Sequence, residues 1–410
     1  MLPVSQAEAR ILDLINPLQT LETVTLREAN RRILGETVVS GQDFPYWPNS
    51  AMDGYAVQWQ DVAQASPDQP VSLTIIEEIP AGQEPQRILN TGQAARIFTG
   101  AKLLQGADTV VMQEQTQRQG DQVLILSAPP KKGHFVRSPG EYCQKGGRLL
   151  TAGMRLQAPE LAVLATAQVR QVPVYRRPQV AIFSTGDELI SVEETLTGAK
   201  IVDSNQYALA AFVENQGAIP VHLGIVPDDP DRLKHTMAQA IASADLVLST
   251  GGVSVGDHDY VEKLLAELGG EIVIRSVPMK PGKPLTVAKF ANGCVYFGIP
   301  GNPVSALVSC WRFVQPAIAK LSGLAAPWSP VWVKAQTQTS LTSDGQRETY
   351  LWGRVQFSAT GDLTFQIAPG SHSSGNLINL AQANALAVLP IGTTAIAPLA
   401  TVHLLLPQGL

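Results

Sequence analysis

The sequence predicts a multidomain protein of mixed α and β structure, and three observations lead to this fold class. A chain of 410 residues exceeds what one hydrophobic core usually organises, so we expect about two to four domains. Apolar residues make up 45% and charged residues 16%, which excludes disorder across the whole chain. The 34 glycines and 29 prolines predict many turns and short strands.

Helical patterns stand at the N-terminus and again near the middle of the chain. Apolar residues recur at helical spacing over residues 5–17, and a second short helix is expected over residues 26–34. A third helix is expected over residues 160–169. Because a different pattern separates them, residues 1–40 and 141–176 are expected to form one discontinuous connecting domain.

Residues 41–140 have the pattern of a β domain. Short runs at residues 71–76, 95–98 and 109–112 alternate or are continuously apolar, and Gly and Pro separate them. This segment interrupts the two helical stretches. We therefore expect an inserted β domain between the two parts of the connecting domain.

Residues 177–326 repeat a strand, a polar loop and a helix. Strands are expected at residues 180–183, 221–225 and 246–248. Such alternation predicts a doubly wound parallel sheet covered by helices on both faces, with ligands at the carboxyl ends of the strands. Short apolar runs return after this segment, so residues 327–410 are expected to form a small β domain.

Charge and cysteine content exclude several classes of protein. The net charge is −5 and no basic stripe appears, which argues against a nucleic-acid partner. The three cysteines show no metal-ligand spacing, which favours a reducing cytoplasm over disulfides or zinc. No signal peptide and no apolar run of about 20 residues is recognised. We expect a soluble cytoplasmic protein without a membrane partner.

Four polar loops follow apolar strands of the α/β segment, and the first two carry acids. In residues 184–188 a glycine permits close backbone approach, and Glu188 is suited to a hard cation. A helix cap is the alternative reading of that loop. Residues 249–259 combine small residues, whose N–H groups can hold an anion, with Asp257 and Asp259. The alternative there is a long solvated turn.

The third and fourth loops favour an anion. Lys280 and Lys283 lie in a segment restricted by two prolines and a glycine, and two close cations repel unless an anion lies between them. Molybdate or phosphate is the natural partner, and two solvated lysines are the alternative. Asn302 is expected to cap a helix that begins at Pro303, whose positive end could face an anion.

Two further polar residues stand in the β segment. Asp53 lies in a run of turn-forming and small residues, for which a buried turn is the alternative to a site. Thr99 follows a strand, where its hydroxyl could bind a ligand or a backbone carbonyl. Neither residue identifies a function alone.

Five segments taken together resemble the MoeA family of molybdopterin molybdenumtransferases, which includes the E domain of gephyrin. They are residues 49–56, 184–189, 250–257, 280–284 and 300–305, in the family's order. The resemblance covers essentially the whole chain. It implies the four domains above, with a molybdopterin-binding α/β domain and a C-terminal β barrel. It also implies a homodimer with a shared active site, in which Asp53 and Thr99 of one subunit face Lys280 of the other.

The resemblance implies that molybdate is inserted into adenylylated molybdopterin in the presence of Mg²⁺, which releases AMP and gives the molybdenum cofactor. Transient contacts with the adenylyltransferase and with cofactor-accepting enzymes are implied as well. The implied catalytic residues are Asp53, Thr99, Glu188, Lys280 and Lys283, and the implied Mg²⁺ ligands are Glu188, Asp257 and Asp259. The implied substrate contacts are Asp228, Gly251, Gly252, Ser254, Asp259, Asn302, Ser305, Arg347, Ser373 and Ser374.

Two other functions stay open at this point. One is a non-catalytic scaffold similar to gephyrin, and the other is the molybdopterin adenylyltransferase, which is similar in fold to the α/β domain alone. The charged loops and the additional domains favour the molybdate step. The chain departs from the family at Tyr142, where bacterial members often carry an acid, so no catalytic acid is assigned there.

Overall fold

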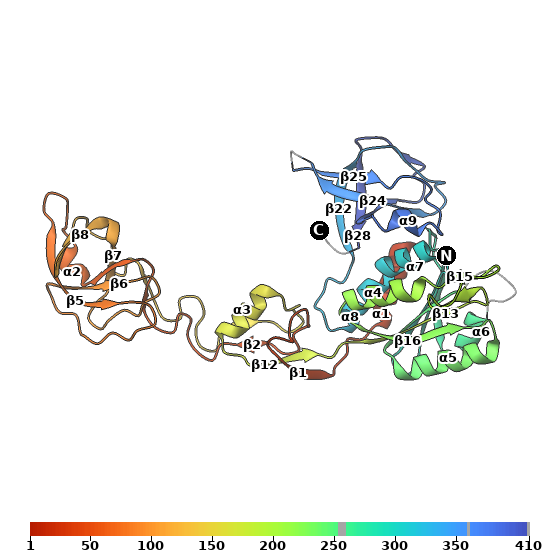
Figure 1. Ribbon diagram of the computed structural model, residues 1–410, viewed down its shortest axis with the longest axis horizontal. Helices are drawn as coiled ribbons and strands as arrows, with labels where there is room; N and C mark the ends of the chain where they lie inside the picture. Colours follow the sequence, from red (N-terminus) through yellow and green to blue (C-terminus); the bar gives the residue numbers. More distant parts are fainter. Residues whose placement is uncertain (253–259, 359–360, 408–410) are drawn as a thin grey trace. The chain divides into compact units, whose positions relative to one another are not determined.

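The computed structural model describes residues 1–252, 260–358 and 361–407, and the chain divides into two compact units (Figure 1). The larger unit comprises Met1–Gly35, Ala152–Ala158 and Gln171–Leu410. The smaller unit comprises Glu36–Thr151 and Pro159–Arg170. The predicted multidomain α/β plus β class is confirmed. The division into four domains at the boundaries given above stays a prediction.

The smaller unit is built around a six-stranded sheet in the order β7-β4-β6-β5-β9-β8. Two apolar clusters, one around Tyr55 and one around Ile97, form its core. This mainly β structure agrees with the pattern of residues 41–140. Its elements are β2 (Val38–Val39), β3 (Asn49–Ser50), β4 (Gly54–Val57), α2 (Trp59–Val62), β5 (Val71–Ile79), β6 (Gln93–Ile97), β7 (Thr109–Met112), η1 (Gln113–Gln115), β8 (Thr116–Gln119), β9 (Gln122–Ile125), β10 (Val136–Arg137) and β11 (Arg148–Leu150). Helix α3 (Ala158–Thr166) follows.

The larger unit contains a six-stranded sheet in the order β16-β13-β17-β21-β20-β18. Strands β16, β13, β17 and β21 run parallel, as predicted, whereas β20 runs antiparallel to both of its neighbours, β21 and β18. The chain order reverses between β13 and β17, which is where open sheets bind ligands. The bounds are β13 (Gln179–Thr185), β16 (Ile219–Val226), β17 (Leu246–Thr250), β18 (Glu271–Ser276), β20 (Pro284–Lys289) and β21 (Val295–Ile299).

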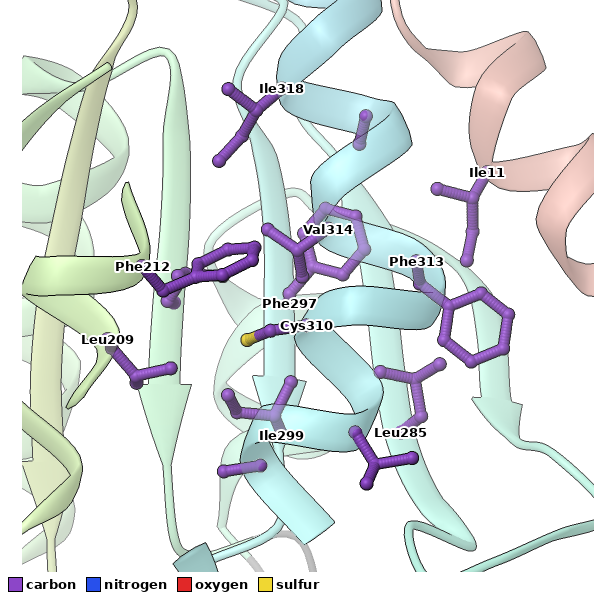
Figure 2. Packing of buried hydrophobic residues seen from close by; sticks show 14 of the residues in the cluster. Ile11, Leu209, Phe212, Leu285, Phe297, Ile299, Cys310, Phe313, Val314 and Ile318 are labelled. Carbon is purple, nitrogen blue, oxygen red and sulfur yellow. The ribbon is translucent and has the colours of Figure 1, made fainter. Parts of the chain in front are cut away.

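Helices cover both faces of this sheet, as the alternation of strands and helices predicted. One face packs against α1 (Val4–Leu14), α4 (Asn205–Asn215), α7 (Pro303–Ser309), the π-helical turn η2 (Cys310–Val314) and α8 (Gln315–Leu321). The other face packs against α5 (Pro230–Ser243) and α6 (Val261–Glu267). Figure 2 shows the first interface, where Phe297 of the sheet lies beside Val314 of the helix. No helix in the described ranges is long and apolar enough to span a bilayer.

A closed β barrel follows the α/β domain. Strand β24 pairs with both β25 and β26, which closes the ring β24-β25-β22-β28-β26. The two-residue strand β19 (Met279–Lys280), which belongs to the α/β segment, adds to β24 in parallel. The elements are β22 (Val331–Thr337), β23 (Leu341–Thr342), β24 (Glu348–Phe357), β25 (Leu363–Ile367), α9 (Leu377–Leu380), β26 (Ala385–Leu389), β27 (Ala395–Ile396) and β28 (Thr401–Leu406).

Short pairings complete the fold, and one of them overturns a predicted helix. Strand β1 (Leu21–Thr25) pairs with β12 (Gln171–Tyr175), β2 pairs with β11, and β14 (Leu189–Ile190) pairs with β15 (Ile201–Val202). The helix expected over residues 26–34 is wrong, because residues 26–31 form turns. Arg31 donates its N–H to Leu156 O (2.8 Å) and Leu34 donates to Met154 O (2.9 Å), so other segments take the bonds a helix would use. Tertiary pairing overrides the local preference.

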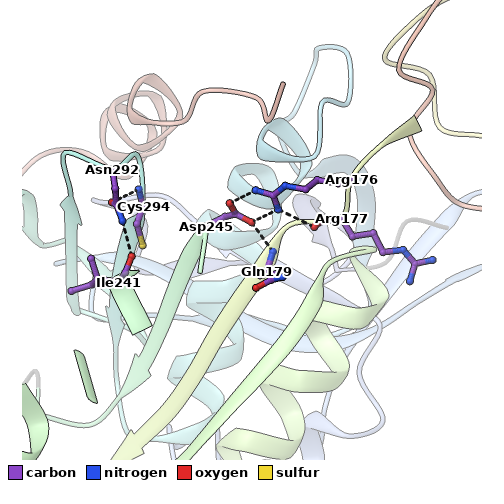
Figure 3. A network of polar contacts seen from close by, with 7 residues as sticks. All are labelled: Arg176, Arg177, Gln179, Ile241, Asp245, Asn292 and Cys294. Atoms are coloured by element: carbon purple, nitrogen blue, oxygen red, sulfur yellow. Dashed lines mark hydrogen bonds and ion pairs between the residues drawn. The ribbon is translucent and has the colours of Figure 1, made fainter. Parts of the chain in front are cut away.

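An ion pair aligns the amino ends of β13 and β17 (Figure 3). Arg176, which precedes β13, donates to both carboxylate oxygens of Asp245 at 2.7 Å, and Asp245 precedes β17. The same carboxylate accepts the N–H of Gln179 at 2.8 Å. Because a bidentate pair fixes direction as well as distance, this contact holds the amino ends of the two neighbouring strands in register.

We expect the three cysteines to differ in the reactivity of their thiols. Burial raises the pKa of Cys294 to about 12 and also raises the pKa of the fully buried Cys310. Because the thiolate is the reactive form, both thiols should stay unmodified at pH 8 in the native protein, while the half-buried Cys143 reacts with a maleimide. Peptide mass spectrometry of timed samples measures this, with unfolded protein as the control. Labelling of Cys294 as early as Cys143 would contradict it.

Candidate functional site

A cavity of about 360 Å³ lies at the carboxyl ends of β13, β17 and β21. The sequence predicted ligands at the carboxyl ends of the strands, and this cavity opens there, at the point where the chain order of the sheet reverses. Three loops that follow these strands supply most of its walls. The lining residues are Thr185, Glu188, Leu189, Ile201, Asn205, Thr250, Gly251, Gly252, Pro284, Pro300, Gly301, Asn302 and Pro303.

The loop after β17 approaches the end of β13 more closely than a side chain allows. Gly251 has a φ of +90°, and a Cβ added there would lie 2.3 Å from the carbonyl oxygen of Thr185. Gly252 also has a positive φ, of +62°. Glycine is therefore required at residue 251 for both conformation and space. The close approach leaves main chain, rather than side chains, to form this wall.

Carboxylates surround the end of β13. Glu188 lines the cavity, and Asp228 accepts a hydrogen bond of 2.7 Å from the hydroxyl of Thr185. Asp229 has a structural role, because it caps α5 by accepting from the N–H of Arg232 at 2.8 Å. Within the described ranges no cluster of three His, Cys, Asp or Glu residues could hold a metal ion. Ser254, Asp257 and Asp259, all predicted site residues, lie outside the described residues.

A second cavity of about 620 Å³ lies between the α/β domain and the barrel within the larger unit. Lys280, Lys283 and Arg347 bring three cationic side chains to its lining. The hydroxyl residues predicted for substrate contact, Ser305, Ser373 and Ser374, line it as well. Pro284, Pro300 and Asn302 line both cavities, so the two cavities adjoin.

Strand pairing places the lysine loop beside the barrel. Lys280 is opposite Thr349 in the parallel pairing of β19 with β24, which brings it near Arg347. Gly282 has a φ of +105°, and a Cβ there would lie 2.9 Å from the Ser309 hydroxyl. The loop therefore needs glycine to turn back against α7. Two domains thus contribute cations to one cavity.

The two lysines differ in their partners. The Lys280 amino group donates to Asp344 Oδ2 at 2.9 Å, and Arg347 Nη2 lies 3.7 Å from the same oxygen. Hydrogen bonds from Lys280 and from the Gln346 N–H lower the pKa of Asp344. Among the described residues no hydrogen bond or ion pair forms with the Lys283 amino group. Asp344 therefore pairs with two of the three cations, whereas Lys283 is exposed and has no such partner within the described ranges.

Asn302 does not cap the following helix with its side chain, which corrects that prediction. The helix does begin at Pro303, but the Asn302 amide makes no capping hydrogen bond. A capping side chain would accept the N–H of Val304. That N–H instead donates to the carbonyl oxygen of Ser374 at 3.2 Å. The Asn302 side chain is thus left to line the two cavities.

Sequence reasoning missed two polar residues near the second cavity. Asp344 stands three residues before Arg347, and that spacing was the only available signal. His372 lines the cavity, its Nε2 lies 2.9 Å from Ala368 O, and its ring lies 4.3 Å from the Trp352 ring. Burial lowers the pKa of His372, and its Nδ1 is buried without a partner in the described chain. Burial therefore disfavours the charged imidazolium form of His372.

Asp53 and Thr99 meet in the smaller unit. Asp53 Oδ1 accepts from both the N–H and the hydroxyl of Thr99, each at 2.7 Å. These hydrogen bonds, the one from the hydroxyl first, lower the pKa of Asp53. Tyr142 also lies in this unit, where its side chain is 66% exposed. The structure therefore brings together Asp53 and Thr99, two residues to which the resemblance assigns a joint role.

Three family models match the chain in order. They are the MoeA N-terminal region (domain I and II) over residues 2–167, a probable molybdopterin binding domain over residues 181–320, and the MoeA C-terminal region (domain IV) over residues 334–405. The chain belongs to the MoeA family. The resemblance inferred from the five segments is therefore confirmed.

Curated relatives in the MoeA family match over most of their lengths. A protein of Nostoc sp. is 57% identical over 92% of this chain and 87% of its own. A protein of Haemophilus influenzae is 37% identical over 79% of this chain and 78% of its own, and one of Bacillus subtilis is 34% identical over 99% and 94%. Each is named molybdopterin molybdenumtransferase.

Solved MoeA structures share the whole fold. A crystal structure of the molybdopterin biosynthesis MoeA protein of Pyrococcus horikoshii OT3 has a TM-score of 0.85 and 31% identity, and covers 99% of this chain and 100% of that chain. A second structure from Pyrococcus has a TM-score of 0.81 and 27% identity, with both chains fully covered. The architecture of sheet, barrel and inserted β sheet is thus that of MoeA proteins.

Proposed function

We propose that this MoeA-family protein inserts molybdenum from molybdate into adenylylated molybdopterin and releases AMP. The observation that carries this proposal is that the two cavities adjoin, since Pro284, Pro300 and Asn302 line both of them. The cavity at the strand ends is lined by Gly251, Gly252 and the carboxylate Glu188, which suits a pterin phosphate with a bound cation. The cavity beside the barrel is lined by three cationic side chains. A substrate that extends from one into the other would bring its reacting end to an oxyanion.

The cationic cavity is the proposed molybdate end of the site. Lys280, Lys283 and Arg347 neutralise the dianion, and the hydroxyls of Ser305 and of Ser373 or Ser374 donate hydrogen bonds to its oxygens. The same cations stabilise charge that develops as the phosphate link is cleaved. The catalytic contribution of Lys280 and Lys283 is therefore electrostatic.

The glycine-lined cavity is the proposed end for pterin, phosphate and Mg²⁺. Gly251 and Gly252 present main chain to the ligand, while Asp228 and Asn302 are the proposed polar contacts. Glu188 fits Mg²⁺, because this ion commonly binds one or two carboxylates together with substrate phosphates. Asp257 and Asp259 complete the proposed ligand set. When bound, Mg²⁺ supplies Lewis-acid stabilisation of the phosphates.

A shared active site in a homodimer is part of this proposal. The described lining of both cavities comes from the larger unit, whereas Asp53 and Thr99 belong to the smaller one. We assign Asp53 and Thr99 the positioning of the reacting groups in the partner's site. Mixing inactive Asp53→Asn chains with inactive Lys283→Ala chains should restore activity if sites are shared. The transient enzyme partners and the cytoplasmic location remain predictions of the sequence.

The decisive experiment measures AMP. Purified protein is incubated with adenylylated molybdopterin and Mg²⁺, with or without molybdate, and AMP and active cofactor are quantified. We expect AMP release to require molybdate and to match the cofactor formed. Equal AMP release without molybdate, with no metal incorporated, would refute the proposal. A scaffold would release none, and an adenylyltransferase would instead form pyrophosphate from ATP and molybdopterin.

A further inference from the structure

Asp344 is an acid of the chain placed among the cations of the cationic cavity. Its Oδ2 accepts from Lys280 at 2.9 Å and lies 3.7 Å from Arg347 Nη2. Both of these cations line the cavity, whereas Lys283 makes no such contact within the described chain. One carboxylate oxygen therefore lies where two of the three cations converge.

The surroundings hold Asp344 in this place. Its Oδ1 accepts the N–H of Gln346 at 3.0 Å, so the carboxylate is fixed at both oxygens. The turn that carries it is held by the Ser343 hydroxyl, which accepts from Gly345 N at 3.0 Å. Lys280 is fixed from the other side by the pairing of β19 with β24. The contact is thus made by two anchored segments rather than by two free side chains.

We propose that Asp344 sets the oxyanion affinity of the cavity by acting as an internal counter-ion that the ligand must displace from Lys280 and Arg347. This inference rests on the proposed function, because it concerns the same site. Binding becomes an exchange, in which the cations leave a carboxylate and gain an oxyanion. The displaced carboxylate remains nearby and repels the ligand. Both effects weaken binding and favour release of the oxyanion toward the substrate.

A purely supportive role for Asp344 predicts the opposite sign. If the carboxylate served only to hold Lys280 in a productive position, its removal would loosen the lysine and weaken binding. As a counter-ion, its removal frees two cations and strengthens binding. Asp344→Asn separates these cases, because the amide oxygen can still accept from Gln346 while the charge is lost.

Calorimetric titration with molybdate, and separately with sulfate, tests the proposal. We expect Asp344→Asn to bind both anions about two- to fivefold more tightly than the wild type, the range typical of one exposed ion pair. Asp362→Asn is the matched control, since it removes an equal charge in the turn between β24 and β25, at the far end of β24 from Lys280. That variant should match the wild type. In the Lys280→Ala background, Asp344→Asn should give a smaller gain.

Unchanged or weaker binding by Asp344→Asn overturns the proposal, as does an equal gain in Asp362→Asn. Absence of oxyanion binding in both wild type and Asp344→Asn overturns it too. Failure of the proposed function is recognised separately. If AMP release ignores molybdate while Asp344→Asn still binds sulfate more tightly, the enzyme assignment fails and the counter-ion role stands.

Discussion

Replacing Lys283 by alanine is expected to slow molybdate-dependent AMP release by about 100- to 1,000-fold, the usual cost of removing one preorganised electrostatic donor. Lys283 lines the cationic cavity and is exposed. Its amino group contacts no partner in the described chain, so its removal costs little stability. The change therefore isolates the charge presented to the ligand. Replacing Lys280 is a less specific test, because it also removes the hydrogen bond that Lys280 donates to Asp344.

Rates and stability must be measured together to check the Lys283 prediction. Stopped assays of AMP give the rate, and urea unfolding gives the free energy of unfolding. Lys334→Ala is the control, since Lys334 is an exposed lysine in β22 that does not line the cavity. It should keep the wild-type rate. A Lys283→Ala variant that loses less than tenfold would exclude a catalytic role for this lysine.

Replacing Arg312 by alanine is expected to destabilise the larger unit by about 3–5 kcal/mol, as when one partner of a buried ion pair is removed. The Arg312 and Glu8 side chains are 5% and 13% exposed, and Nη1 of Arg312 lies 2.7 Å from Glu8 Oε2. Arg312 Nε also donates to the Tyr350 hydroxyl at 3.1 Å. Without the guanidinium, the Glu8 carboxylate would stay buried and uncompensated.

A double variant tests whether the lost stability comes from the buried Glu8 carboxylate that Arg312→Ala leaves without a partner. Arg312→Met with Glu8→Met should be much more stable than Arg312→Ala, because replacing both members of a buried pair is often neutral. Urea unfolding followed by tryptophan fluorescence measures all three proteins. If Arg312→Ala loses less than 1 kcal/mol, the pair is not the anchor that joins α1, η2 and the barrel.

Elements with a clear internal pattern were predictable from the sequence. Helix α1 and strand β7 follow their apolar spacing closely, and the parallel strands follow from continuous apolar runs bounded by polar loops. The helix predicted over residues 26–34 was wrong because backbone groups of this segment hydrogen-bond to residues 154–156. No local sequence signal indicates such a distant partner. Helix α3 was expected to reach residue 169 but ends at Thr166.

The candidate site was predictable in its residue types but not in its contacts. Proline and glycine around Lys280 and Lys283 marked a restrained cationic loop, and both lysines do line one cavity with Arg347. The pairing of β19 with β24 and the contact of Lys280 with Asp344 could not be predicted, because they join residues 69 and 64 positions apart in the chain. The cap predicted at Asn302 was wrong for the same reason, because the carbonyl of the distant Ser374 accepts the Val304 N–H that Asn302 would have bound.

The pairing of β19 with β24 also restricts how MoeA chains can be recombined. A chimera joined at the linker before residue 327 would transfer the whole closed barrel, yet it would leave one paired segment, Met279–Lys280, with the original parent. The foreign barrel would then meet a lysine loop that evolved beside a different strand. Functional exchange of barrels between relatives should therefore require the loop around residues 279–284 to travel with them.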